Sequence, residues 1–184
     1  MSDTQLTPPV SERDHVAGPN DAPVTLVEYG DYECPYCGMA YPILKSVRRA
    51  LGKRMRFVYR HFPLNETHPH ARHAAEASES AAVEGKFWEM HDALFEHQHA
   101  LEDEDLVRYA KSLGIDATRV EEDLAAGTYT KRVREDFRSG VRSGVNGTPT
   151  FFINGARYDG PWADERQFIR ALRQAAKIQA SSDA

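Results

Sequence analysis

The sequence has few cysteines and no long apolar run. Its two cysteines, Cys34 and Cys37, stand three positions apart, so a disulfide between them would close too short a loop to act as a structural staple. No stretch approaches the roughly 18 consecutive apolar residues of a membrane span, and Met1–Pro9 lacks the apolar segment of a secretory signal. These absences predict a chain that does not enter membranes and stays in the cytoplasm as written. If the sequence is a trimmed mature form, a periplasmic or other extracytoplasmic location is expected instead.

A concentration of basic residues is also lacking. The chain has 23 Lys and Arg residues against 28 Asp and Glu residues, and its formal net charge is -5. Basic residues occur only in short pairs such as Arg48-Arg49, so neither nucleic acid nor anionic lipid is expected as a partner. Hydrophobic residues make up 41% and charged residues 28%, as is typical of a globular protein that folds by itself.

The first half of the pattern is a strand, a helix and a second strand. Residues 24–29 form a β-rich run that ends at Gly30, which predicts a strand buried on both faces. After Cys34, apolar and small residues recur at helical spacing as far as Leu51, which predicts a helix of about 15 residues, bent at Pro42. Residues 56–60 read as the second strand. Such a unit implies parallel strands joined by a right-handed crossover.

Helical patterns then fill residues 67–140, and strands return near the end. The first of these helices is expected from Pro69 to Gly85. Further helices are expected at 87–96, 103–113, 117–126 and 129–140. Strands are predicted at 150–153 and 156–158, because Asn154-Gly155 between β-prone runs indicates a hairpin. A final amphipathic helix is predicted at 164–178.

These elements predict one α/β domain with an inserted helical domain. Residues 13–62 and 146–178 would form the α/β domain, and residues 63–145 the all-helical insertion. Residues 1–12 and 179–184 show no periodicity and are expected to be flexible tails.

The segment Cys34-Pro35-Tyr36-Cys37 stands at the predicted turn from strand to helix. A helix N-terminus presents unpaired N–H groups and a positive dipole end, which lower the pKa of a thiol placed there. Cys34 is therefore predicted to be the attacking, more exposed thiol. Cys37 lies on the same helix face within disulfide reach and is predicted to be the resolving thiol. Pro35 suits the first turn because it has no N–H to leave unsatisfied.

Two other interpretations of the cysteine pair remain open. The same spacing supplies half of many zinc sites, and His68 and His73 could supply a second pair of ligands. Those histidines begin about 30 residues after Cys37, whereas a finger motif has a gap of roughly a dozen. The pair could also be inert. The position at a helix start favours redox chemistry, so no metal is expected, and the Cys34–Cys37 disulfide itself would replace any cofactor.

Glu28 is a candidate for proton transfer. By the period of two along a strand, it shares a face with Val24 and Leu26 and points toward the interior. Burial raises the pKa of a carboxyl group, which would suit Glu28 to exchange a proton with Cys37. The alternative is a strand-end glutamate that reaches solvent.

The histidines are expected to be structural. His61 follows the second strand and is predicted to be partly exposed. The others outside the N-terminal region are expected at a helix start or on a solvated face, without catalytic roles; they are His68, His70, His73, His91, His97 and His99.

Three segments, in this order, resemble the DsbA-like family of thiol-disulfide oxidoreductases of the thioredoxin superfamily. They are Glu28–Cys37, His61–Leu64 with the Ala-rich stretch after it, and Val145–Gly155, and the resemblance covers roughly residues 14–178. It implies a thioredoxin fold with an all-helical domain inserted between the β-α-β and β-β-α halves. It also implies that the family's acidic residue is Glu28. Its cis-proline, which faces the dithiol, would be Pro149, preceded by Thr148.

The resemblance further implies exchange of disulfides with protein or peptide substrates and with an unidentified redox partner. Pro35, Tyr36, Thr148 and Pro149 are the expected substrate contacts. The most oxidising members resemble Cys-Pro-His-Cys, so Tyr36 removes one source of thiolate stabilisation and argues against potent oxidase activity. Two alternatives stay open: a glutathione-dependent peroxidase or transferase on the same fold, and a chaperone-like module that binds clients.

Overall fold

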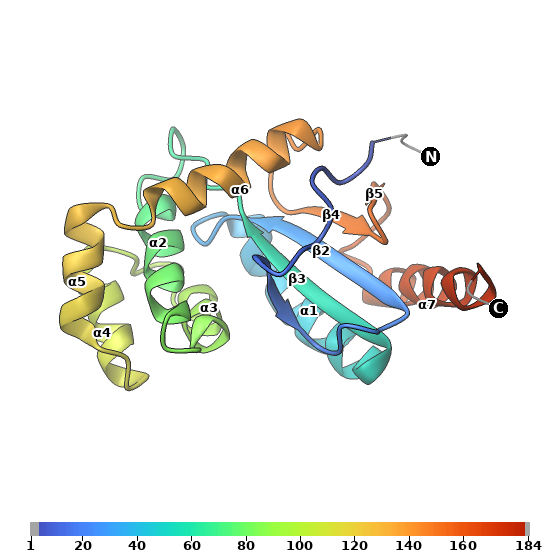
Figure 1. Cartoon of the computed structure of the whole chain (residues 1–184), viewed down its shortest axis with the longest axis horizontal. Coiled ribbons are helices and arrows are strands. Elements are labelled where there is room, and N and C mark those ends of the chain that lie inside the picture. Colours follow the sequence, from blue (N-terminus) through green and yellow to red (C-terminus); the bar gives the residue numbers. More distant parts are fainter. Residues whose placement is uncertain (1–3, 183–184) are drawn as a thin grey trace. The chain divides into compact units, whose positions relative to one another are not determined.

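The structure, a computed structural model, describes residues 4–182 (Figure 1). The chain divides into two compact units. The sheet unit contains the residues up to Tyr29, Met39–Arg60, and the residues from Ser139 onward. The helical unit contains Gly30–Gly38 and His61–Arg138.

The sheet has five strands in the order β1-β3-β2-β4-β5. The strands are β1 His15–Ala17, β2 Val24–Gly30, β3 Met55–His61, β4 Thr150–Ile153 and β5 Ala156–Tyr158. Helix α1, Pro35–Leu51, connects β2 to β3, and these two strands point the same way (Figure 1). β4 pairs antiparallel with β2, and β5 with β4. The predicted β-α-β and β-β-α halves are therefore confirmed.

Strand β1 is an element that the sequence pattern does not predict. It pairs antiparallel with β3, with His15 opposite Tyr59 and Ala17 opposite Phe57. Its three residues are all half-buried. A strand this short shows too little alternation to be recognised, and its pairing with β3 depends on residues about 40 positions away.

Aromatic side chains from β4 fill both faces of the sheet unit. Phe151 packs against Phe168 of α7, Glu165–Ser182, with ring centroids 5.2 Å apart. The next residue, Phe152, meets Tyr29 edge-on at 5.8 Å. Both phenylalanines are at most 1% exposed. The alternation along β4 thus places one ring on each face, as expected of a central strand.

The two ends of the chain differ from the expected flexible tails. Gln5 forms a β-bridge with Ala156, and the Leu6 N–H donates to the Gly155 carbonyl at 2.8 Å. Leu6 is also buried. The prediction of a flexible tail is therefore wrong for residues 4–9, because the outer edge of β5 offers backbone groups that this segment satisfies. It is also wrong for residues 179–182, which continue α7. Residues 1–3 and 183–184 lie outside the described residues.

A buried ion pair holds the N-terminal segment to β3. The guanidinium of Arg60 donates to both carboxylate oxygens of Asp14, at 2.7 and 3.0 Å. It also donates to the Tyr29 hydroxyl and to the carbonyls of Pro8 and Pro9. Burial acts to lower the pKa of Arg60, but the hydrogen bond and charge of Asp14, together with Tyr29, outweigh burial and raise it. Arg60 therefore keeps its positive charge in this buried position.

Removal of the Asp14 carboxylate should be strongly destabilising. We expect Asp14→Ala to lower the free energy of unfolding by about 3–5 kcal/mol, because it leaves the Arg60 charge buried without its counter-ion. Urea unfolding at neutral pH measures this loss. Asp159→Ala is a matched control: Asp159 pairs with Arg157 at 2.8 Å, but its side chain is 57% exposed, so we expect about 1 kcal/mol or less. Equal losses for the two variants would contradict the prediction.

The helical unit follows the predicted pattern closely. Its helices are α2 Ala71–Ala82, α3 Phe87–Glu96, α4 Asp103–Ser112 and α5 Ala117–Ala126. It also contains α6, Thr130–Arg142, as far as Arg138. The predictions at 87–96 and 117–126 match α3 and α5 end to end. Nine residues of α2 are buried, most of them alanine or serine, because small side chains let neighbouring helices approach closely. Within the described part of the chain, every helix falls short of the length or the apolar character that a bilayer crossing requires.

Candidate active site

The two cysteines lie where β2 gives way to α1. β2 ends at Gly30, and α1 begins at Pro35, so Cys34 immediately precedes the first turn of the helix. Both cysteines are thiols in this structure and both are buried. Cys34 is 4% exposed and Cys37 0%, in the order that the sequence predicts. Between them, Tyr36 is 62% exposed, so the dipeptide that separates the thiols faces solvent.

The backbone of the dithiol turn is held by hydrogen bonds. The Cys34 N–H donates to the Asp31 carbonyl at 3.2 Å, and the Cys34 carbonyl accepts from the Gly38 N–H at 3.1 Å. The side-chain amide of Gln98 donates to the carbonyls of Cys34, at 3.0 Å, and Tyr32, at 2.7 Å. Gln98 stands just after α3, in a loop that the sequence marks with no signal. It fixes the turn by a contact across more than 60 residues.

Gly38 makes room for this amide. A Cβ atom at Gly38 would overlap the side chain of Gln98. We therefore expect Gly38→Ala to displace Gln98 and to lower the free energy of unfolding by about 1–2 kcal/mol through the two lost hydrogen bonds. In a Gln98→Ala background the same substitution should be neutral or stabilising by up to about 1 kcal/mol, because alanine favours a helix more than glycine does. Urea unfolding of the double-mutant cycle measures this change of sign; additive effects would contradict it.

Asp31 is a buried carboxylate at the base of the dithiol turn. It accepts hydrogen bonds from the Glu33 N–H at 2.8 Å, the Leu64 N–H at 2.8 Å and His68 Nδ1 at 2.7 Å. Nearby, the Glu33 carboxylate accepts from the His70 N–H at 2.7 Å. These bonds tie the turn to the segment that leads into α2. The sequence pattern indicates no role for Asp31 and predicts only that His68 lies at a helix start.

His68 is the partner that balances this charge. Burial acts to lower the pKa of His68, but the hydrogen bond that its imidazole donates to Asp31 and the charges of Asp31, Cys34 and Glu33 together outweigh burial and raise the pKa. The stabilisation from the pair is therefore fully present below about pH 6.5, the unfolded value, and is lost as the pH rises through the raised pKa.

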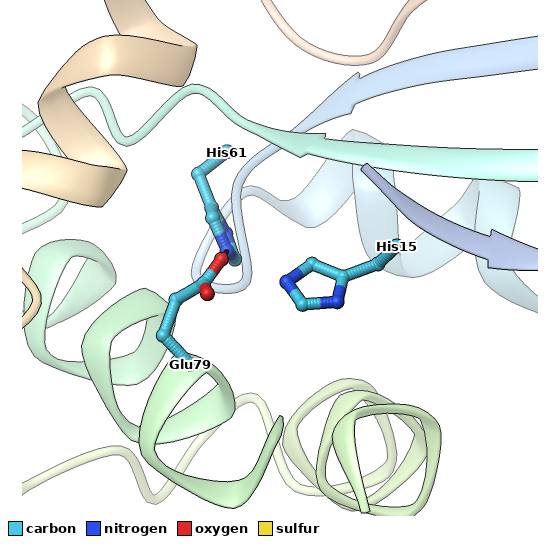
Figure 2. A group of neighbouring side chains, drawn as sticks. All are labelled: His15, His61 and Glu79. Carbon is cyan, nitrogen blue, oxygen red and sulfur yellow. Dashed lines mark hydrogen bonds and ion pairs between the residues drawn. The ribbon is translucent and has the colours of Figure 1, made fainter. Parts of the chain in front are cut away.

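His61 differs from its prediction. It is 1% exposed rather than partly exposed, and its Nε2 lies 2.9 Å from a carboxylate oxygen of Glu79 in α2. Figure 2 shows the two side chains facing one another; His15, also drawn, lies on β1. The backbone N–H of His61 donates to the Asp136 carboxylate at 3.1 Å. Arg132 pairs with Glu79 at 3.6 Å and also with Asp136, so its positive charge partly offsets the two carboxylates.

His91 also differs from its prediction. It was expected on a solvated face but is 3% exposed, and its Nδ1 lies 3.1 Å from the Tyr32 hydroxyl. Its ring meets those of Tyr32 and Phe95 edge-on. The reason is that Tyr32, two residues before Cys34, packs among α3 side chains and needs a polar partner there.

Glu28 lies on β2 in the sheet unit and is 1% exposed. It stands opposite Phe151 of β4, so both side chains project from the same face of the sheet. The predicted burial is confirmed, and the alternative of a glutamate that reaches solvent is wrong. Its role in proton transfer stays a prediction.

Thr148 and Pro149 immediately precede β4 in the sheet unit. The peptide bond between them is cis, the conformation that the family resemblance implies. Thr148, Pro149, Pro35 and Tyr36 remain predicted substrate contacts.

The dithiol belongs to the helical unit. Gly30–Gly38 groups with His61–Arg138, through the contacts of Tyr32, Asp31 and Cys34 with residues of that unit. The sequence placed this segment wholly in the α/β domain, and placed the boundaries of the insertion at residues 63–145. The difference at residues 30–38 arises because the segment is joined to the strands by the chain but to the helices by its side chains.

A family model described as Thioredoxin matches residues 10–171, most of the chain. A protein of Mycobacterium sp. (strain KMS) named Na(+)/H(+) antiporter NhaA 1 is 47% identical over 171 residues. That match covers 92% of this chain and 28% of the relative. The chain thus spans about a quarter of the length of the curated relatives that it matches.

Two solved structures share the fold. A thioredoxin-like oxidoreductase from Silicibacter pomeroyi DSS-3 is 28% identical, with a TM-score of 0.79 over 91% of this chain and 94% of the other. The alpha-DsbA1 protein of Wolbachia pipientis gives a TM-score of 0.79 with 17% identity, over 96% of each chain. The chain therefore belongs to the thioredoxin family.

Proposed function

We propose that this chain exchanges disulfides with protein or peptide substrates through Cys34 and Cys37. The observation that carries the proposal is the position of the pair at the start of α1, with Cys34 the more exposed thiol and the dipeptide between them facing solvent. A helix start stabilises a thiolate, and a second thiol three residues on can resolve the intermediate. No cofactor beyond the dithiol is needed for this chemistry.

The reaction proceeds in two exchange steps. The Cys34 thiolate attacks one sulfur of a substrate disulfide, so that a Cys34–substrate bond forms and the other substrate sulfur leaves as a thiolate, which takes up a proton. Cys37 then loses its proton, attacks the Cys34 sulfur and releases the second substrate thiolate. The substrate disulfide gains two electrons and the protein dithiol loses two; the reverse sequence installs a disulfide. Glu28 is proposed to accept and return the Cys37 proton.

The test is to trap the intermediate. Reduced Cys37→Ser protein, mixed with a disulfide-bonded protein such as insulin, should accumulate a covalent complex that dithiothreitol dissolves and mass spectrometry identifies at Cys34. The same variant with Cys34→Ser added is the control and should form none. Absence of a complex with protein disulfides, combined with turnover of glutathione and a peroxide or electrophile, would overturn the proposal in favour of a small-molecule enzyme.

The direction of exchange is measured by the reduction potential. Equilibration of the Cys34–Cys37 pair with glutathione buffers, followed by alkylation of the remaining thiols, gives this value. A potential of about -120 mV would make the chain an oxidant, and one of about -270 mV would make it a reductant.

A further inference from the structure

The surroundings of Asp31 pose an electrostatic problem for the dithiol. Asp31 stands three residues before Cys34, and its carboxylate is fully buried. A buried negative charge at the base of the turn opposes a second negative charge on the Cys34 sulfur, because the interior screens such repulsion less than water does. The Pro35-Tyr36 dipeptide between the two cysteines carries no positive charge. A positive charge close to Cys34 would offset this repulsion and add to the stabilisation that the helix start gives a thiolate.

His68 is placed to supply it. Its Nδ1 lies 2.7 Å from the Asp31 carboxylate, and its side chain is 13% exposed, so it is held in place but remains open to protons from solvent. Asp31 also accepts the Cys34 N–H through its backbone carbonyl at 3.2 Å, so the residue that holds the imidazole is bonded directly to Cys34. The negative charges of Asp31, Cys34 and Glu33 favour the protonated imidazole. Coupling between two ionisable groups is reciprocal, so a positive His68 must favour the Cys34 thiolate by the same free energy.

We propose that His68, held by Asp31, is a positioning and charge-balancing residue that stabilises the Cys34 thiolate and makes the Cys34–Cys37 disulfide more oxidising. The inference rests on the proposed function, in which Cys34 is the nucleophile. A stabilised thiolate favours the reduced protein, and so strengthens it as an oxidant. In this chain the cation comes from the segment before α2 rather than from the dipeptide between the cysteines.

The mechanism predicts a particular pH dependence. While His68 is protonated, its charge offsets that of Asp31 and lowers the cost of ionising Cys34. As the pH rises through the raised pKa of His68, the imidazolium is lost and the offset disappears. The contribution of His68 to thiolate formation should therefore fade at alkaline pH.

The first test titrates the Cys34 thiolate by its ultraviolet absorbance in a Cys37→Ser background. His68→Gln should raise the midpoint by about 0.5–1 pH unit, and His68→Lys, which keeps a positive charge, should restore it. His73→Gln is a matched control, because His73 also binds an aspartate through Nδ1, Asp103 at 2.6 Å, and Cys34 lies outside that pair. An unchanged midpoint in folded His68→Gln protein, or an equal rise in His73→Gln, would overturn the proposal.

The second test uses the wild-type protein and does not depend on any variant folding. Titration of His68 by NMR should give a midpoint about 0.5–1 pH unit lower in the disulfide form than in the dithiol form, because oxidation removes the thiolate. Equal midpoints would refute the coupling. Both measurements are made without a substrate. A chain that shows the coupling but forms no complex with protein disulfides would therefore keep this inference while the proposed function fails.

Discussion

Replacement of Cys34 by serine should reduce disulfide exchange to the rate of the buffer alone. A serine hydroxyl does not ionise near neutral pH and cannot form a disulfide, so neither the attack nor the mixed disulfide is possible. The measurement is the rate at which the chain reduces insulin disulfides with dithiothreitol as reductant. Residual exchange near the wild-type rate would show that the reaction does not pass through Cys34.

The control for this result is Cys37→Ser. That variant keeps the attacking thiol, so it should react once with a substrate and then stall as the mixed disulfide. Because both cysteines are buried, each variant must first show the wild-type circular dichroism spectrum. Protection of clients from aggregation that survives in the Cys34→Ser/Cys37→Ser double variant would favour the chaperone-like alternative.

The second large effect is expected at Glu28. Glu28→Gln should slow the release of substrate from the mixed disulfide by about 100-fold, the lower end of the roughly 10²–10⁴-fold that a positioned acid or base commonly contributes to such a step. Glutamine has nearly the same shape, so the 1% exposed site on β2 should remain filled. Stopped-flow measurement of resolution, from a preformed mixed disulfide at Cys34, isolates this step from the first attack.

The attack step serves as the internal control for Glu28→Gln. Its rate should change little, because the proposed proton transfer concerns Cys37 alone. Glu33→Gln is a second control, because it makes the same carboxyl-to-amide change at a half-buried residue that binds the His70 backbone N–H. Unchanged resolution in Glu28→Gln would remove Glu28 from the mechanism and leave it a buried structural acid.

Local patterns in the sequence determined most of the element order. The helical spacing between Cys37 and Leu51 predicts α1, and the Asn154-Gly155 turn predicts the hairpin of β4 and β5. These predictions succeed because each depends on a period of 3.6 or 2 residues, or on a residue such as glycine that a turn requires. The position of Cys34 at a helix start follows from the same local signals.

Patterns of this kind could not reveal partners that come from distant parts of the chain. The N-terminal segment pairs with β5 and the turn before it through the Arg157 N–H and the Gly155 carbonyl, and such backbone groups occur in almost every residue. His61 is buried against Glu79 of α2, and His91, which lies on α3, is buried against Tyr32 of the dithiol segment. A lone histidine in the sequence has no feature that distinguishes this environment from an exposed one.

The sequence by itself determined the fold class, the dithiol and its place between β2 and α1, because these depend on residues close together along the chain. Tertiary structure alone decided which side chains surround that dithiol. His68 bonds Asp31 across 37 residues, and Gln98 bonds Tyr32 across more than 60. A hydrogen bond over such a separation leaves no periodic trace in the sequence. The proposed redox centre was therefore readable in one segment, whereas the charged side chains beside it came together only when the helical unit folded.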